Sequence, residues 1–288
     1  MLELFVEPFV KFEFMRRAMF GCLVIAAGAA PLGVFLMLRR MSLTGDVMAH
    51  AILPGAAIGY LVGGFSLSAL TFGGIIAGFV VALLSGLIAR TTILKEDASL
   101  ATFYLISLAL GVLIISIRGD NIDLIHILFG SVLALNDGAL LLLCSVTTFT
   151  MLSLALLFRL ILMESVDPQF LASLSRLGAV AHYCFLALVV LNLVAGFHAM
   201  GSLMIIGIML LPAATARFWA RSVGTLILIA FLTGAASSLL GLLASFHFSV
   251  PSGPAIILTA GLFHLISLFI GREGGWISSN SKNSKATS

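Results

Sequence analysis

Long apolar runs, separated by short polar links, dominate the chain. A helix needs about 17–25 consecutive, mostly apolar residues to cross a bilayer, and runs of this length recur along most of the sequence. We therefore predict an all-α polytopic membrane bundle of about nine transmembrane helices, with eight as the alternative. The nine predicted spans cover approximately residues 17–38, 47–65, 68–90, 99–117, 138–160, 179–197, 200–218, 224–246 and 253–271.

Prolines inside two of these runs leave the number of spans open. Pro54 lies in the second predicted span and Pro212 in the seventh. Proline removes a backbone hydrogen bond from a helix, and in transporters such breaks often lie near the transport path. We predict helix breaks at both positions. The apolar run 124–135 is too short to cross, so it is expected to dip into the membrane and return, or to lie on its surface.

The basic residues predict the orientation, because lysine and arginine gather in cytoplasmic loops. With the N-terminus outside, the C-terminus inside and nine crossings, eleven basic residues fall inside and four outside. The opposite orientation inverts the ratio, so we adopt N-out and C-in. The inner residues are Arg39, Arg40, Arg90, Lys95, Arg159, Arg176, Arg217, Arg221, Arg272, Lys282 and Lys285, and the outer ones are Lys11, Arg16, Arg17 and Arg118.

Composition supports an integral membrane protein. The chain is 61% hydrophobic and 9% charged, whereas soluble domains carry roughly 25% charged residues. No basic stripe with interleaved aromatic residues is present, which argues against nucleic-acid binding. Three cysteines lie within apolar runs and are interpreted as small core residues. They are Cys22, Cys144 and Cys184.

We expect one membrane domain, flanked by two short segments. Residues 1–16 contain acidic residues, lack a cleavage site and are typical of a helix at the membrane interface. Residues 17–271 form the transmembrane domain. Residues 272–288 are rich in Ser, Asn, Lys and Gly and are predicted to be a disordered cytoplasmic tail.

Two acid–histidine pairs are the candidate metal ligands. Asp46 and His50 lie four residues apart at the start of an apolar run, and Asp123 and His126 lie three residues apart. Either spacing puts both side chains on one helical face. Charged groups near the bilayer centre cost ~2.5–3.5 kcal/mol, so they call for a functional explanation. Carboxylate and imidazole ligands suit Zn²⁺, Mn²⁺ or Fe²⁺ and are poor for Cu⁺.

Each pair also has a structural interpretation. Asp46 and Asp123 are good helix N-caps, and His50 could bond to a backbone carbonyl. In the predicted topology the two pairs start from opposite sides, so they meet only if the second span begins deep in the membrane and the 124–135 run folds inward. Among the other histidines, His198 is a candidate for where the metal enters. His182 and His264 are interpreted as core histidines.

The inner link 164–178 is amphipathic and is the longest of the inner links. Asp167 followed by Pro168 is typical of a helix start. Apolar residues then recur at helical spacing, which favours docking into a groove of another protein. A helix resting on the membrane surface is the alternative. The apolar residues are Phe170, Leu171, Leu174 and Leu177.

These motifs resemble those of the integral membrane permeases of bacterial metal-ion ABC transporters, the importers of zinc, manganese and ferrous iron. The resemblance covers nearly the whole chain. It is carried by LRRMSLTGDVMAHAILPGAAIGYLVG (38–63), IDLIHILFGSVLAL (122–135), VDPQFLASLSRLG (166–178), GSLMIIGIMLLPAATARFWAR (201–221) and PSGPAIIL (251–258). The SLxGDxxxHAxLPG and LLPAATAR patterns are its most specific parts.

The resemblance implies a multi-pass protein of the bacterial cytoplasmic membrane with no permanently bound cofactor. Two permease copies would form the path for Zn²⁺ or Mn²⁺, or for Fe²⁺. Two copies of a cytoplasmic ATPase would drive transport, and a periplasmic or surface binding protein would deliver the metal. Asp46 and His50 would belong to the metal path, with Asp123 and His126 as contributors. The VDPQF segment would be the coupling helix, although LSRLG departs from the usual Ala-Leu-Gly ending.

Two other functions remain open at this point. A secondary transporter driven by an ion gradient would also place Asp and His in the membrane, but the docking-like inner helix argues against it. An intramembrane enzyme would require HExxH, GxSxG or GxGD, and none of these motifs occurs. The chain also lacks GxxxxGK[ST], so ATP hydrolysis is expected on a separate subunit.

Overall fold

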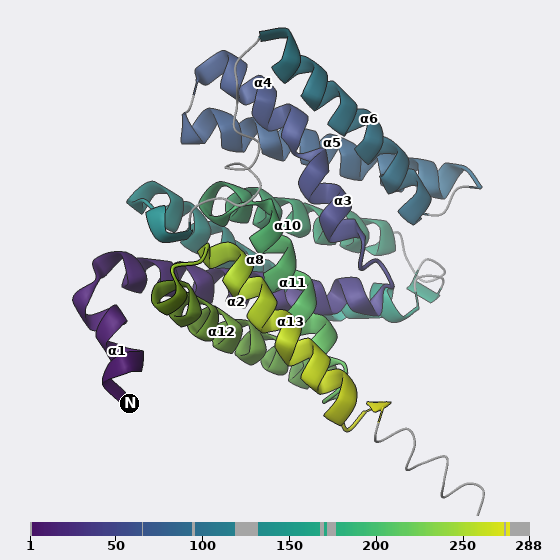
Figure 1. Cartoon of the computed structure of the whole chain (residues 1–288). Coiled ribbons are helices and arrows are strands. Elements are labelled where there is room, and N and C mark those ends of the chain that lie inside the picture. The colour runs from purple at the N-terminus through teal and green to yellow at the C-terminus, as the bar shows by residue number, and fades with distance from the viewer. Residues whose placement is uncertain are drawn as a thin grey trace, which may run out of the picture.

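A computed structural model describes residues 2–64, 66–93, 96–118, 132–167, 170–171, 177–273 and 275–276. Within these ranges the regular elements are helices, and no strand occurs. The predicted all-α fold class is confirmed (Figure 1). Residues Asp123, His126, Pro168 and Leu174, for which functions were predicted, lie outside the described ranges, as do most of the 124–135 run and of the tail.

Most of the described residues lie in helices. Their bounds are α1 Leu2–Lys11, α2 Glu13–Leu38, α3 Thr44–Ala51, α4 Leu53–Gly63, α5 Leu67–Thr91, α6 Glu96–Arg118, the short 3-10 helix η1 Val132–Ala134, α8 Asp137–Val166, α10 Leu177–Met200, α11 Ser202–Ala216, α12 Val223–Phe248 and α13 Ser252–Ile270.

Seven described spans are long and apolar enough to cross a membrane. One of them combines α3 and α4 into Thr44–Gly63, and two shorter apolar stretches, Ala98–Gly111 and Ser202–Ala216, match the remaining predicted runs. The 15-residue α11 is about 22 Å long at 1.5 Å per residue, which is less than the ~30 Å hydrocarbon thickness. The positions of the predicted runs are thus recovered, while nine complete crossings stay a prediction.

The helices form two neighbouring groups. In Figure 1, α4, α5 and α6 lie together at the top, and α2, α8, α10, α11, α12 and α13 form the larger group below. The helix α3 joins the groups, and α10 contacts members of both. Because α2 and α10 lie inside the larger group, they supply most of its fully buried side chains, including Leu32, Phe35, Phe185 and Leu193.

Glycines allow α4 and α5 to touch backbone to backbone. A Cβ atom added to Gly55 would lie 2.0 Å from the carbonyl oxygen of Gly73, and one added to Gly73 would lie 2.1 Å from that of Gly55. No side chain can occupy such a space. Small residues at a helix crossing are the usual way in which membrane helices gain packing contacts. These two glycines therefore fix the distance between α4 and α5.

We expect Gly55→Ala to destabilise the protein by about 1–3 kcal/mol, the usual range for an overpacked core. The added methyl group must push α5 away. Gly261→Ala in α13 is the matched control, because no atom outside the neighbouring backbone of its own helix lies within 4 Å of the added Cβ. Thermal unfolding midpoints in detergent measure the effect. Equal midpoints for both variants would contradict the close crossing.

The two predicted proline breaks differ in outcome. The second span is interrupted at Ile52, where α3 ends and α4 begins with Pro54 in its first turn, as predicted. Pro212 is a correction, because α11 runs as a single helix from Ser202 to Ala216 through it. The Pro212 ring lies beside Gly234 of α12, where an added Cβ would be in ordinary van der Waals contact with the ring Cγ at 3.6 Å. Proline costs α11 one backbone hydrogen bond, and the helix continues past it.

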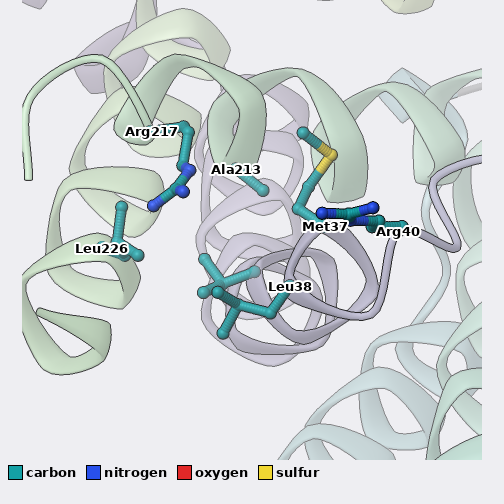
Figure 2. A pocket seen from close by; sticks show the side chains of 7 residues that line it. Met37, Leu38, Arg40, Ala213, Arg217 and Leu226 are labelled. Atoms are coloured by element: carbon teal, nitrogen blue, oxygen red, sulfur yellow. The ribbon is translucent and has the colours of Figure 1, made fainter. Parts of the chain in front are cut away.

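Several arginines gather at one end of the larger group, which we call the basic end. It comprises Arg39, Arg40, Arg217, Arg221 and Arg272, at or next to the ends of α2, α11, α12 and α13. Figure 2 shows Arg40 and Arg217 on neighbouring helix ends around a hollow of about 210 Å³. The other walls of the hollow are apolar, and it contains no predicted metal ligand.

Candidate metal centre

The helix α3 presents the first acid–histidine pair. It begins at Thr44, with Leu43 at the N-cap position and no side-chain cap, so Asp46 lies in the first turn rather than at the cap. Asp46 Oδ1 lies 3.7 Å from His50 Nε2. The prediction that the two side chains share one face is confirmed. At 3.7 Å the two atoms are too far apart for a hydrogen bond.

The start of α3 is buried on one side, at Thr44 and Gly45, and exposed on the other, at Leu43 and Asp46. Gly45 packs against the side chains of Met209 and Leu210 in α11. The carbonyl oxygen of Met209 in turn faces Gly33 of α2, which lies about 7–8 Å inward of Leu38, where α2 ends. Through α11, the start of α3 is linked to the body of α2. The depth of this start in a membrane stays a prediction.

The surroundings of His50 leave its imidazole available. Its ring centroid lies 5.7 Å from that of Tyr104 in α6, and no hydrogen bond joins it to a backbone carbonyl of the described residues. The side chain of His50 is 25% exposed and that of Asp46 is 57% exposed. The opposite face of α3 is anchored, since Met48 is buried and Ser107 donates a hydrogen bond to the carbonyl of Ala51.

The Asp46–His50 geometry suits two ligands of one ion. Zinc binds imidazole nitrogen and carboxylate oxygen at about 2.0–2.2 Å, so two such donors on one ion lie roughly 3–3.5 Å apart. A small side-chain rotation would close the observed 3.7 Å. Among the described residues no group of three or more metal-binding side chains occurs. Any further protein ligand must therefore come from undescribed residues, from rearrangement or from another chain.

His198 lies near the end of α10 that is remote from the basic end. Its Nδ1 lies 2.8 Å from the carbonyl oxygen of Val194, so a protonated Nδ1 donates to that oxygen. The Nε2 atom is buried and has no hydrogen-bond partner in the described part of the chain. A backbone carbonyl that holds one ring nitrogen while the other points elsewhere is the usual arrangement of a metal-binding histidine.

The predicted coupling segment begins as the sequence indicates. Asp167 follows α8, and its carboxylate accepts a hydrogen bond of 2.9 Å from the backbone N–H of Phe170. This is the geometry of a capped helix start. The Phe170 side chain is 53% exposed, whereas Leu171 is 4% exposed. Of these two apolar residues, Leu171 therefore anchors the segment and Phe170 faces outward.

The sequence analysis missed a buried charge cluster at the basic end. Arg39 of α2 forms an ion pair with Glu164 of α8, and both contact His182 of α10. The interpretation of His182 as a core histidine is confirmed by its burial, but the histidine is not alone, because it contacts Glu164 and Arg39. The sequence did place all three residues at or near the borders of predicted spans. Charged residues are common at such borders, so their positions alone did not indicate that they pair.

Comparison with known proteins gives concordant results. The ABC 3 transport family model matches residues 11–271. The manganese import system permease protein ScaB of Streptococcus gordonii is 34% identical over 94% of this chain and 96% of its own. The manganese transport system membrane protein MntC of Halalkalibacterium halodurans is 28% identical over 100% and 99%.

A solved structure extends this likeness to three dimensions. The structure of PsaBC from Streptococcus pneumoniae in complex with a Fab superposes with a TM-score of 0.84, at 31% identity and with 97% of this chain and 100% of that chain covered. The resemblance to metal-ion ABC permeases is confirmed. The chain belongs to the ABC 3 transport family and is a multi-pass protein of the bacterial cell membrane.

Proposed function

We propose that this chain is the membrane subunit of an ATP-driven importer of a divalent transition metal. Manganese is the first candidate because ScaB and MntC are named for it, with zinc and ferrous iron as the alternatives. The observation that carries the proposal is the Asp46–His50 pair inside an apolar bundle. Oxygen and nitrogen ligands suit each of these ions.

The exposure of Asp46 supports a path between two copies of the chain. Its side chain is 57% exposed and lies within the apolar span Thr44–Gly63. A carboxylate facing lipid near the bilayer centre would cost ~2.5–3.5 kcal/mol. A second copy that encloses a water-filled path removes this cost and brings a second Asp46–His50 pair nearby.

Other ligands would complete the coordination of the ion. Asp123 and His126 are proposed contributors, and the buried Nε2 of His198 is available where the metal would enter. Two protein ligands from one chain bind an ion weakly, which suits a transport site that must release it. We therefore assign no permanently bound metal to the chain, and the ion is its cargo.

Energy would come from partner subunits. The chain contains no GxxxxGK[ST] motif, so two copies of a cytoplasmic ATPase would supply the hydrolysis. Their docking site would be the 164–178 segment, where Phe170 is exposed next to the Asp167 cap. A periplasmic or surface binding protein would deliver the metal to the opposite end.

The basic end sets the orientation in this proposal. Its arginines would face the cytoplasm by the positive-inside rule, which puts the 164–178 segment on the same side as the ATPase. The N-terminus would then lie outside and the C-terminus inside. Residues 1–16 would lie at the interface, 17–271 would form the transmembrane domain, and 272–288 would be a cytoplasmic tail.

ATP dependence tests the proposed function. The chain is reconstituted in lipid vesicles with its ATPase and its binding protein, and radioactive manganese uptake is measured with and without ATP. We expect uptake only with ATP, and competition by unlabelled zinc or ferrous iron ranks the metals. Replacement of the ATPase P-loop lysine is the matched control. Uptake that persists in that control, driven by an ion gradient, would instead support a secondary transporter.

A further inference from the structure

The cluster of Arg39, Glu164 and His182 is almost completely removed from solvent. The side chains are 5%, 9% and 6% exposed, respectively. Glu164 uses one oxygen for the ion pair with Arg39 and places the other 3.2 Å from His182 Nδ1. A buried ion pair contributes little net stability compared with apolar residues of the same size. Three such groups in one place therefore call for another role.

Further contacts fix the arginine in a single orientation. Arg39 Nε donates to Ser165 Oγ at 2.9 Å, and Ser165 in turn donates to the carbonyl oxygen of Ile161. The guanidinium carbon lies 4.1 Å from the ring centroid of Phe185, a buried residue of α10. The arginine therefore contacts α8 and α10 at once, through hydrogen bonds, charge and a cation–π contact.

The cluster closes around both ends of the predicted coupling segment. Glu164 and Ser165 are among the last residues of α8, immediately before the Asp167 cap. His182 lies in the second turn of α10, just after the segment returns to the bundle. Arg39 directly follows α2 and contacts both of these borders, which also contact each other through Glu164 and His182.

Arg39 is also close in sequence to the metal-binding helix. Only residues 40–43 separate it from α3, and this link turns sharply, with Arg40 at a φ of 60°. Hydrogen bonds from Met41 N–H to Leu36 and from Thr44 N–H to Met41 hold the link against both helices. A shift of Arg39 is therefore passed to the start of α3 over a short, constrained connection.

His182 gives the cluster two exclusive arrangements. Its Nδ1 lies 3.3 Å from Arg39 Nη1 and 3.2 Å from Glu164 Oε1. A guanidinium only donates hydrogen bonds and a carboxylate only accepts them. One ring nitrogen can satisfy one of these partners at a time: Nδ1 donates to Glu164 when it carries the ring proton and accepts from Arg39 when that proton is on Nε2. A small movement of α8 relative to α10 would exchange the bond together with a shift of the ring proton from Nδ1 to Nε2. An element with two discrete arrangements is what transmission between distant sites requires.

We propose that Arg39, Glu164 and His182 are positioning residues that transmit movement of the 164–178 segment to α3, and thus to Asp46 and His50. This inference rests on the proposed function, in which an ATPase docks on that segment. Loss of the cluster should leave docking and ATP hydrolysis in place while disconnecting them from metal movement. The expected signature is uncoupling rather than inactivity.

The test compares manganese uptake with ATP hydrolysis in the same vesicles, using the full complex with ATPase and binding protein. For Glu164→Gln, we expect the rate of ATP hydrolysis to stay within twofold of wild type. The ratio of manganese ions transported to ATP molecules hydrolysed should be at least tenfold lower than in wild type. Glu273→Gln is the matched control, because Glu273 pairs with the exposed Arg221 at the same end. Its ratio should stay within twofold of wild type.

A double variant separates coupling from folding. Arg39→Gln with Glu164→Gln leaves no unpaired charge from the Arg39–Glu164 pair, so it should assemble and show the same loss of ratio. An unchanged ratio in Glu164→Gln, or a normal ratio in the double variant, would overturn the proposal. Failure of both variants to assemble with the ATPase would assign the cluster to folding and also overturn it. Wild-type uptake that needs no ATP would refute the proposed function instead.

Discussion

Asp46→Asn is expected to lower metal accumulation at least tenfold without loss of the protein from the membrane. The change removes the negative charge and keeps the side-chain size, so it weakens an oxygen ligand and little else. Replacing a residue that merely hydrogen-bonds to a metal ligand typically lowers metal affinity or activity 10–100-fold. Replacing a ligand itself should therefore cost at least as much. Radiotracer uptake in a strain that lacks other importers measures the effect, and His50→Ala should reproduce it.

Matched controls make this prediction specific. Asp137 lies in the first turn of α8, where it is exposed and pairs with Arg17. Asp137→Asn should leave uptake within twofold of wild type. His247 is exposed at the end of α12, and His247→Ala should likewise be tolerated. Normal accumulation in Asp46→Asn and His50→Ala would remove both residues from the metal path.

Phe170→Asp is expected to reduce co-purification of the ATPase at least tenfold. An exposed aromatic residue that anchors an interface typically contributes 2 kcal/mol or more, and 1.4 kcal/mol corresponds to a factor of ten in affinity. The aspartate would also bring an unpaired charge into the contact. Pull-down of the ATPase through a tag on this chain measures the loss, and ATP-driven uptake should fall with it.

The control for this variant is an equally disruptive change at the opposite end of the helix bundle. Phe248, at the end of α12, is 77% exposed and lies remote from the basic end. Phe248→Asp should leave the amount of bound ATPase unchanged. Equal recovery of the ATPase with Phe170→Asp and with wild type would show that the 164–178 segment is not the docking site.

Helix positions could be predicted well because each depends on a run of neighbouring residues. The apolar runs predicted nine stretches, and each coincides with a described helix or helix pair. Pro54 likewise marks a true interruption at Ile52. Pro212 shows the limit of this reasoning, because α11 continues through it, and a proline alone does not indicate whether the surrounding helices hold its own helix intact.

The site could be predicted only in part, for the same reason. Asp46 and His50 lie within one helical turn, so their spacing alone indicated a shared face. The position of α3 depends on packing against Met209 and Leu210, which are far away in the sequence. Binding of the same ion by Asp123 and His126 stays a prediction, since both residues lie outside the described ranges.

The buried cluster depends on pairing across three helices and was therefore invisible locally. Arg39 and Glu164 are 125 positions apart in the chain, and His182 lies on a third helix. Each had a plausible local explanation, as an inner-loop charge, a helix-end acid or a core histidine. Only the fold shows that they neutralise one another.

An anomalous difference map, recorded at the manganese edge from crystals of the complex grown with Mn²⁺, tests the central claim most directly. The account predicts a peak within bonding distance, about 2.0–2.3 Å, of both an Asp46 carboxylate oxygen and His50 Nε2. A manganese peak elsewhere along the path, with Asp46 and His50 turned away from it, would contradict the assignment of these residues as ligands of the transported ion.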